Sequence, residues 1–148
     1  MITYTVKVDD NGDTEWRLDG KWHRTDGPAI ESADGSKEWL LNDKRHRTDG
    51  PAIESADGSK EWYLDGNRHR TDGPAVESVD GSKLWYLNGK RHRTDGPAVE
   101  SADGSKRWYL DGKELTQSQW IEAVKPKVTG CVGKVVEVDG VKYKLVKA

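Results

Sequence analysis

Apolar residues recur along the chain in short clusters that repeat every 23 residues. Each cluster is Trp-x-Leu, followed after a polar stretch by Pro-Ala-Ile or Pro-Ala-Val. Glycine turn signals of the types [Asp/Asn]-Gly, Thr-Asp-Gly and Asp-Gly separate the clusters. Segments this short cannot be helices of normal length, so the pattern predicts a tandem array of β repeats.

The repeat unit reads W-x-L-[DN]-G-[KN]-x-H-R-T-D-G-P-A-[IV]-E-S-x-D-G-S-K-x. Four full units run from Trp16 to Arg107, and a fifth opens at Trp108 but departs from the pattern after Lys113. The segment from Asn11 to Glu15 is a degenerate half-unit. Because the ends of a repeat array need caps, we expect this half-unit to cap the N-terminal end.

Within a unit, Ala-[Ile/Val]-Glu-Ser, the Asp-Gly turn and Ser-Lys-x-Trp-x-Leu together predict a β-hairpin. The pleat would place Trp and Leu on one face of the strand and the residue between them on the other. That middle residue is Arg17, Leu40, Tyr63, Tyr86 or Tyr109, a mix that predicts a partly exposed face.

The hairpins, joined by the link [Lys/Asn]-x-His-Arg-Thr-Asp-Gly-Pro, are expected to stack into a long twisted antiparallel sheet. The fold class is therefore mostly all-β, and stability comes from neighbouring hairpins, since one hairpin alone is marginal. The tryptophans and leucines would form a continuous apolar ladder along the stack. Its members are Trp16, Trp39, Trp62, Trp85, Trp108, Leu18, Leu41, Leu64, Leu87 and Leu110.

The pattern changes after Gly112. Residues 115–126 predict a short helix in which Thr116 is the N-cap and Gln119 completes a capping box. Trp120, Ile121 and Val124 would share the face that covers the open end of the sheet. Residues 134–146 predict a hairpin around Asp139-Gly140 that pairs Val138 with Val141 and Val136 with Tyr143. We thus expect a capping half-repeat in 1–15, β repeats in 16–113, a capping helix in 114–126 and a hairpin in 127–148.

Composition narrows the class of protein. The 148 residues are 33% hydrophobic and 34% charged with a mean hydropathy of −0.93, yet seven Trp and five Tyr take the chain out of the disordered regime. A net charge of −2 argues against a nucleic-acid binder driven by bulk charge. The lone cysteine, Cys131, excludes an internal disulfide framework. No apolar run is long enough to span a membrane, and the first residues lack a signal-peptide pattern, so we expect a cytoplasmic protein.

The unit resembles the MORN repeat, which is also 23 residues long and contains elements such as Asn88-Gly89-Lys90-Arg91-His92 and Asp103-Gly104-Ser105-Lys106. It departs from MORN where Arg-Thr-Asp-Gly-Pro-Ala replaces a Gly-x-Gly segment. It is more similar to the H-R-x-D-G-P-A repeat proteins of bacteria and tailed bacteriophages. This resemblance covers residues 11–113, with a weaker likeness in the tail. It implies stacked hairpins and a non-enzymatic scaffold or interaction role, and the departures argue against the lipid binding of MORN proteins.

The four histidines occupy one repeat position and would form a column with neighbours roughly 10 Å apart, two strand spacings. The residues are His23, His46, His69 and His92. Metal ligands must lie about 2.0–2.1 Å from a shared ion, so this spacing argues against a metal site, and we expect no cofactor. The structural alternative is that each histidine packs beside a tryptophan and hydrogen-bonds a turn carbonyl.

The repeated arginines allow two interpretations. Arg24, Arg47, Arg70 and Arg93 could line a groove that binds phosphates or carboxylates. They could instead pair with repeated acidic residues and join neighbouring units. Each unit carries matching charges, at Asp26, Asp49, Asp72 and Asp95 and at Glu31, Glu54, Glu77 and Glu100, which favours pairing.

Catalysis is not expected, because it needs one asymmetric group of residues, whereas His, Asp and Ser recur uniformly here. Cys131 is read as a small buried residue rather than a nucleophile. The repeated outer surface offers tyrosine and arginine, the residue types that dominate binding hot spots. The predicted binding residues are Tyr63, Tyr86, Tyr109, Arg45, Arg68 and Arg91, although the segment after Thr116 could carry the specific contacts instead.

The leading functional hypothesis is a non-enzymatic protein-binding module. The phage resemblance points to a host-encoded protein partner, with inhibition of a defence or regulatory system as its sharpest form. A structural component of a virion and a nucleotide or nucleic-acid binder acting through the arginine column are the alternatives. An exposed sheet edge would also permit a homodimer.

Overall fold

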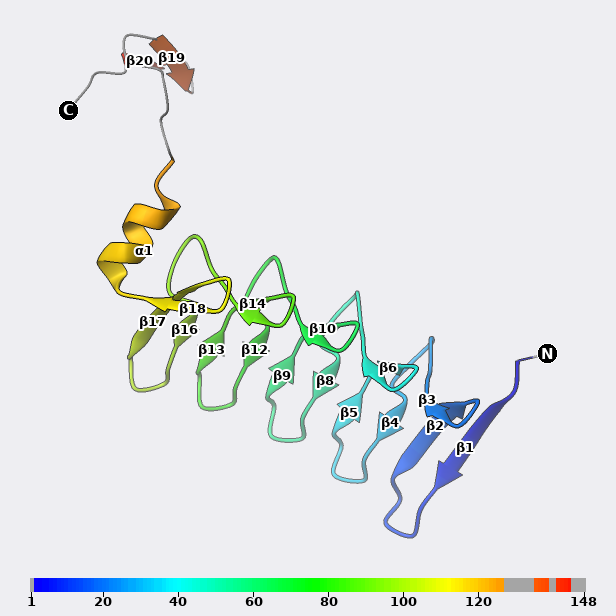
Figure 1. Cartoon of the computed structure of the whole chain (residues 1–148). Coiled ribbons are helices and arrows are strands. Elements are labelled where there is room, and N and C mark those ends of the chain that lie inside the picture. The colour runs from blue at the N-terminus through cyan, green and yellow to red at the C-terminus, as the bar shows by residue number, and fades with distance from the viewer. Residues whose placement is uncertain (1, 127–134, 139–140, 145–148) are drawn as a thin grey trace.

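The computed structural model describes residues 2–126, 135–138 and 141–144. Residues 2–126 form an elongated row of stacked β-hairpins that ends in a short helix (Figure 1). The predicted fold class, a mostly all-β array of antiparallel hairpins, is confirmed.

The backbone of the array is a 12-stranded antiparallel sheet. Its strands follow almost in chain order, β1-β2-β4-β5-β8-β9-β12-β13-β16-β17-β18, with β3 beside β2. The end strands are β1 (Tyr4–Val8), β2 (Thr14–Leu18), β3 (Lys21–Trp22), β17 (Lys106–Leu110) and β18 (Lys113–Leu115). The inner strands are β4 (Ile30–Glu31), β5 (Lys37–Glu38), β8 (Ile53–Glu54), β9 (Lys60–Glu61), β12 (Val76–Glu77), β13 (Lys83–Leu84) and β16 (Val99–Glu100).

The predicted hairpin around each Asp-Gly turn is present. In the first, β4 pairs with β5, and the turn is closed by the N–H of Gly35 donating to the carbonyl of Ser32 at 2.9 Å. Gly35 has φ +95°, a conformation that strains any other residue, so the glycine signal in the sequence reports a real steric requirement.

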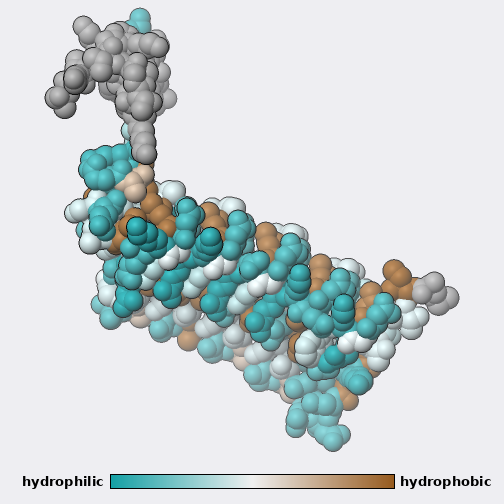
Figure 2. All heavy atoms as spheres, in the orientation of Figure 1, coloured by the Kyte–Doolittle hydropathy of each residue, from teal (hydrophilic) through white to brown (hydrophobic). Residues whose placement is uncertain are grey.

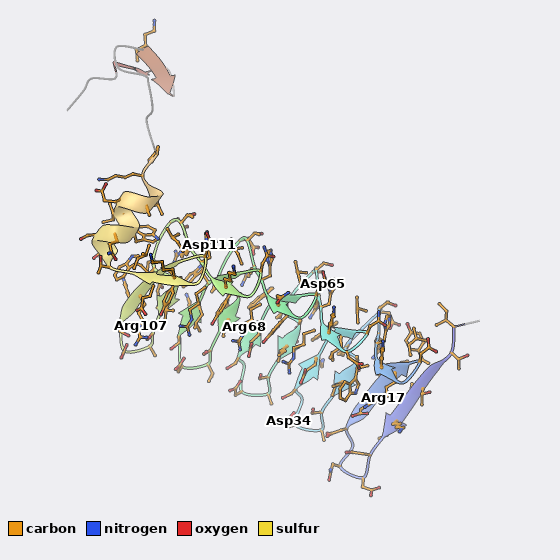
Figure 3. The ribbon with its side chains drawn as sticks, viewed as in Figure 1. Arg17, Asp34, Asp65, Arg68, Arg107 and Asp111 are labelled. Carbon is orange, nitrogen blue, oxygen red and sulfur yellow. The ribbon has the colours of Figure 1, made fainter. Side chains whose placement is uncertain are left out.

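Each inner unit also contains a second hairpin, which the sequence reasoning took for a link. Its strands are β6 (Leu40–Leu41) with β7 (Lys44–Arg45), β10 (Tyr63–Leu64) with β11 (Asn67–Arg68), and β14 (Tyr86–Leu87) with β15 (Lys90–Arg91). In β10–β11 the turn residues Asp65 and Gly66 have φ of +50° and +83°, as a two-residue type I′ turn requires. Asp65, at the tip of β10–β11, and Asp111, at the tip of β17–β18, lie on the opposite side of the array from the Asp-Gly turn that contains Asp34 (Figure 3).

Strand register gives the sheet two chemically different faces. The tryptophan face, which carries the repeated Trp and Leu, also carries a row of alternating charges in which every direct cross-strand neighbour has the opposite sign. The row runs Glu31, Lys37, Glu54, Lys60, Glu77, Lys83, Glu100 and Lys106. Opposite charges paired in this way add about 0.2–1 kcal/mol per pair to sheet stability.

The core lies on the other side, here named the tyrosine face for Tyr63, Tyr86 and Tyr109. These side chains are only 6–9% exposed, Leu40 at the same repeat position is 6% exposed, and the alanine after each proline is fully buried. The predicted partly exposed face is therefore wrong. Conversely, the ten residues of the predicted Trp and Leu ladder are half-buried rather than core. The alternation of side chains along a strand assigns residues to the two faces of the sheet. It does not reveal which of the two faces is covered by the second hairpins and their side chains.

Elements outside the repeat close the array at both ends. At the N-terminal end, β1 pairs with β2 along five residues, which places Tyr4 against Trp16 with ring centroids 6.2 Å apart. At the other end lies α1 (Gln117–Val124), which packs on β17 and β18 (Figure 1). The predicted N-cap Thr116 and its capping box with Gln119 are confirmed. On the predicted covering face, Trp120 and Val124 are half-buried, whereas Ile121 is 40% exposed.

The last described elements are β19 (Val135–Val138) and β20 (Val141–Lys144), which form an antiparallel pair. Val138 is opposite Val141 and Val136 is opposite Tyr143, as the sequence predicts. The turn at Asp139-Gly140 and Cys131 lie outside the described residues. Among the described helical segments, none is long and apolar enough to cross a membrane.

Candidate functional site

The most distinctive feature of the tryptophan face is a tight loop with the sequence His-Arg-Thr-Asp-Gly-Pro, here named the arginine loop. It occurs at residues 23–28, 46–51, 69–74 and 92–97. In the third copy Arg70 donates from Nε to Asp72 Oδ1 at 2.8 Å and from Nη1 to the Pro74 carbonyl at 3.1 Å and Glu77 Oε1 at 2.8 Å. The other three loops repeat these bonds at 2.8–3.2 Å. One arginine thus fixes the shape of each loop.

The glycine of the loop permits this arrangement. A Cβ atom on Gly73 would lie 3.0 Å from Arg70 Cζ, and one on Gly27 would lie 2.8 Å from Arg24 Cζ. These distances are below normal van der Waals contact. The glycine of the loop is therefore required by the close approach of the guanidinium rather than by an unusual backbone angle.

Each of these arginines also covers an indole ring. The guanidinium carbon of Arg24, Arg47, Arg70 and Arg93 lies 3.8–4.0 Å from the ring centroid of Trp16, Trp39, Trp62 and Trp85, respectively. Arginine stacked on tryptophan in this way contributes about 0.5–2 kcal/mol. The guanidinium groups are consequently engaged on one side by the ring and at their edges by carboxylates.

The prediction that these arginines pair with the repeated Asp and Glu is confirmed, but the expected role in joining neighbouring units is wrong. Arg70, Asp72 and Glu77 all belong to the same unit, Trp62 to Leu84. The contacts between units come from other groups. Arg70 donates its backbone N–H to the carbonyl of Tyr86 at 3.1 Å, and the Val79 N–H donates to Ser59 Oγ at 3.0 Å.

The histidine column provides a further contact between units. His46 Nδ1 accepts the backbone N–H of Asp65 at 3.1 Å, and His69 Nδ1 accepts that of Asn88 at 3.1 Å. The expected turn carbonyl is therefore replaced by turn groups of the next unit, since His46 Nδ1 also lies 3.0 Å from the side-chain oxygen Oδ1 of Asp65. Within the described residues no three His, Cys, Asp or Glu side chains are grouped closely enough to hold a metal ion.

Successive arginine loops enclose three equivalent depressions, here named the first, second and third notch. The second notch, of about 500 Å³, lies between the Arg47 and Arg70 loops and has Trp62, Leu64 and His69 in its lining. The first, of about 620 Å³, has Trp39, Leu41 and His46 at the same positions. The third, of about 540 Å³, has Trp85, Leu87 and His92. Along the upper rim of the array, apolar patches alternate with polar side chains (Figure 2).

The indole N–H groups of the notch tryptophans are available to a ligand. Trp39, Trp62 and Trp85 are half-buried, and none of their Nε1 atoms forms a hydrogen bond with another described residue. The one buried indole nitrogen without a partner in this part of the chain is that of Trp22, which lies elsewhere. Trp N–H groups in partly buried positions usually donate to an acceptor. The three equivalent indole N–H groups are therefore available to donate to an acceptor on a ligand.

The notch row is bounded at both ends by aromatic residues from outside the repeat. Tyr4 lies 6.2 Å from both Trp16 and His23, ring centroid to ring centroid. At the other end, α1 begins where a fifth arginine loop would start, because Thr116 takes the position of the loop arginine. Trp120 Nε1 donates to the carbonyl of Arg93 at 2.9 Å and so ties the helix to the last loop. Three open notches thus lie between two closed ends.

The exposed charge at the notch rims is acidic. The side chains of Asp49, Asp72 and Asp95 are 80–82% exposed, whereas those of Arg47, Arg70 and Arg93 are only 18–21% exposed. A hydrogen bond from the neighbouring arginine lowers the pKa of each of these aspartates, and of Asp26, below its usual value. The carboxylates are therefore ionised throughout the neutral and mildly acidic range.

The six predicted binding residues do lie together, on the tyrosine face, but largely as a closed network. Tyr63 donates its hydroxyl to Glu61 at 2.8 Å, and Arg68 donates to the same carboxylate at 2.9 Å. Arg68 also lies over both Tyr63 and Tyr86, at 5.8 and 5.6 Å from their ring centroids. Burial raises the pKa of Tyr63, and the hydrogen bond to Glu61 adds to this effect.

The other predicted members follow the same arrangement. Arg45 is 44% exposed and pairs with Glu38 at 3.0 Å, while Arg91 donates to the hydroxyls of Tyr86 and Tyr109. The sequence offered the loop arginines as the lining of a groove, which they are, but it did not single out the Thr, Trp, Leu and His residues that complete each notch. The sequence signal for the notches was an arginine and an aspartate two residues apart, followed by Gly-Pro. This spacing indicates a compact loop, and it recurs after every Trp-x-Leu segment except the last.

Sequence comparison finds no family model and no curated protein that matches this chain.

Proposed function

We propose that this chain is a non-enzymatic protein-interaction module that binds its partner along the three notches. The observation that carries the proposal is the repetition of one half-apolar depression, with a free indole donor, at three successive positions. A partner contacts the same chemistry three times, so weak individual contacts combine into a stronger one.

The charge arrangement favours this function over binding of phosphate groups by the arginine column. The loop arginines are each engaged by two carboxylates and a tryptophan ring. A nucleic acid would have to displace these partners and approach the exposed aspartates. The uniformity of the notches also favours binding over catalysis, which needs one asymmetric group of residues.

The H-R-x-D-G-P-A unit resembles repeat proteins of bacteria and tailed phages. On this basis we further propose that the partner is a host protein, whose activity is blocked when the rigid array covers it. Such blocking needs an interface of ordinary size, about 800 Å² per partner, so the partner would contact the surface around the notches as well as the notches themselves.

The test uses substitutions that fill notches without touching the core. Thr48 is an exposed residue of the first and second notches and Thr71 of the second and third, so the double variant Thr48→Arg/Thr71→Arg obstructs all three notches. The matched control is Ala56→Arg/Val79→Arg, at exposed tips of the Asp-Gly turns. A partner captured from bacterial lysate, identified and purified, is expected to bind the notch variant at least tenfold more weakly than the control. Equal affinity for both variants would place the binding surface elsewhere.

A further inference from the structure

The spacing of the notches identifies the kind of segment that fits them. Each unit adds two strands to the sheet, so equivalent notches are separated by about 9.6 Å at the usual strand spacing. A polyproline II helix repeats every three residues, with a rise of about 9.3 Å per turn. Across the three notches the two repeats differ by less than about 1 Å.

Other regular conformations fit less well. Side chains on one face of an extended strand recur about every 6.6 Å, so a strand presents no equivalent group at the notch spacing. Seven residues of an α-helix advance about 10.5 Å, but its carbonyls are already hydrogen-bonded along the helix. The unpartnered indole N–H groups of Trp39, Trp62 and Trp85 need free acceptors. Polyproline II has no internal hydrogen bonds and leaves every carbonyl available.

The lining of the notches suits the same ligand. In the second notch Trp62 and Leu64 supply an apolar surface for proline rings, and aromatic-lined grooves are a general means of recognising this conformation. The rim adds a charge preference. Asp49 and Asp72 project carboxylates that are 80% exposed, beside arginines whose charge is already neutralised by pairing. Each turn of the ligand therefore meets an acidic position.

We propose that the three notches bind one continuous proline-rich segment in the polyproline II conformation, one turn per notch, with a basic residue in each turn. This inference rests on the proposed interaction function and names the chemistry of the partner. Tyr4 and α1 close the row, so the segment engaged spans about nine residues, three turns at three residues each.

The test uses synthetic peptides and the full chain at physiological ionic strength. The probe is Pro-Pro-Lys repeated to about 12 residues, which covers three turns with one to spare. Gly-Ser-Lys of equal length controls for charge, and Pro-Pro-Glu controls for conformation. Calorimetry is expected to show Pro-Pro-Lys binding at least tenfold more tightly than either control. In nitrogen–proton spectra the indole signals of Trp39, Trp62 and Trp85 should shift more than those of Trp16 and Trp120.

The variants separate the possible outcomes. Thr48→Arg/Thr71→Arg should weaken Pro-Pro-Lys binding at least tenfold, and Ala56→Arg/Val79→Arg should leave it unchanged. Equal binding of Pro-Pro-Lys and Gly-Ser-Lys would show simple charge attraction and overturn the inference. If the notch variant still loses a lysate partner while Pro-Pro-Lys does not bind, the interaction function stands and the polyproline assignment falls. If neither partner depends on the notches, both proposals fall.

Discussion

Arg70 lies with its guanidinium carbon 3.9 Å from the ring centroid of Trp62 while its Nε donates to Asp72 at 2.8 Å. The same contacts recur in every arginine loop, so one side chain joins the loop, the sheet and the wall of a notch. The shape of each notch therefore depends on a few side chains that can be tested by substitution.

Arg70→Ala is expected to lower the free energy of unfolding by about 2.5–4 kcal/mol. The loss combines the stacking on Trp62, about 1 kcal/mol, with charge-assisted hydrogen bonds to a largely covered guanidinium, about 1.5–3 kcal/mol together. Urea denaturation measures it. The control is Arg107→Ala, an exposed arginine whose removal should change stability by no more than about 0.5 kcal/mol. Similar losses in both variants would show that the loop contacts are energetically unimportant.

Gly73→Ala is expected to destabilise the protein by about 1–3 kcal/mol, because the new methyl group would meet the guanidinium of Arg70 at 3.0 Å. The effect should depend on that arginine. In an Arg70→Ala background the same glycine substitution should cost much less, which a double-mutant cycle detects as a coupling energy. Additive costs would mean that the glycine is needed for some other reason.

Gly66→Ala tests the second hairpin. Gly66 has φ +83°, and a Cβ there would make only ordinary contacts, the nearest at 3.8 Å from Lys44. The expected loss of about 1–2 kcal/mol is therefore purely conformational. Gly66→Asn should cost less, since asparagine tolerates this region of backbone space. Thermal unfolding of the two variants compares them, and equal losses would contradict a type I′ turn.

Acid should destabilise the array through the loop aspartates. The folded-state pKa values of Asp26, Asp49, Asp72 and Asp95 are lowered, so the unfolded chain takes up protons first as the pH falls. Their contribution is complete above the unfolded value, near 3.9, and is lost as the pH drops through the lower folded values. The free energy of unfolding is measured from neutral pH downwards for the wild-type protein and for a variant in which all four aspartates are changed to Asn. In that pH window it should fall less steeply for the variant than for the wild type. Identical slopes would contradict the assigned pairing.

The capping helix and the C-terminal pair were predictable because their signals are local. The capping box at Thr116 depends on groups three residues apart, and the register of β19 with β20 depends on a separation of only two residues between the strands. The second hairpin had an equally local signal in Asp65-Gly66. It was missed because strands of two residues are too short to produce a hydrophobic period.

The sequence by itself determined the 23-residue unit, its turns and the stacking of hairpins, because turn chemistry and strand period act over a few residues. Only the tertiary structure decided which face is the core. Before the tryptophan of each inner unit the chain pairs within the large sheet, and after it the chain pairs within the second hairpin. As a result Tyr63 is buried beneath Arg45 and Arg68, while Trp62 is half-buried under Arg70. The notches likewise exist only between loops of successive units, and that spacing is set by two strands of sheet rather than by residues adjacent in the chain.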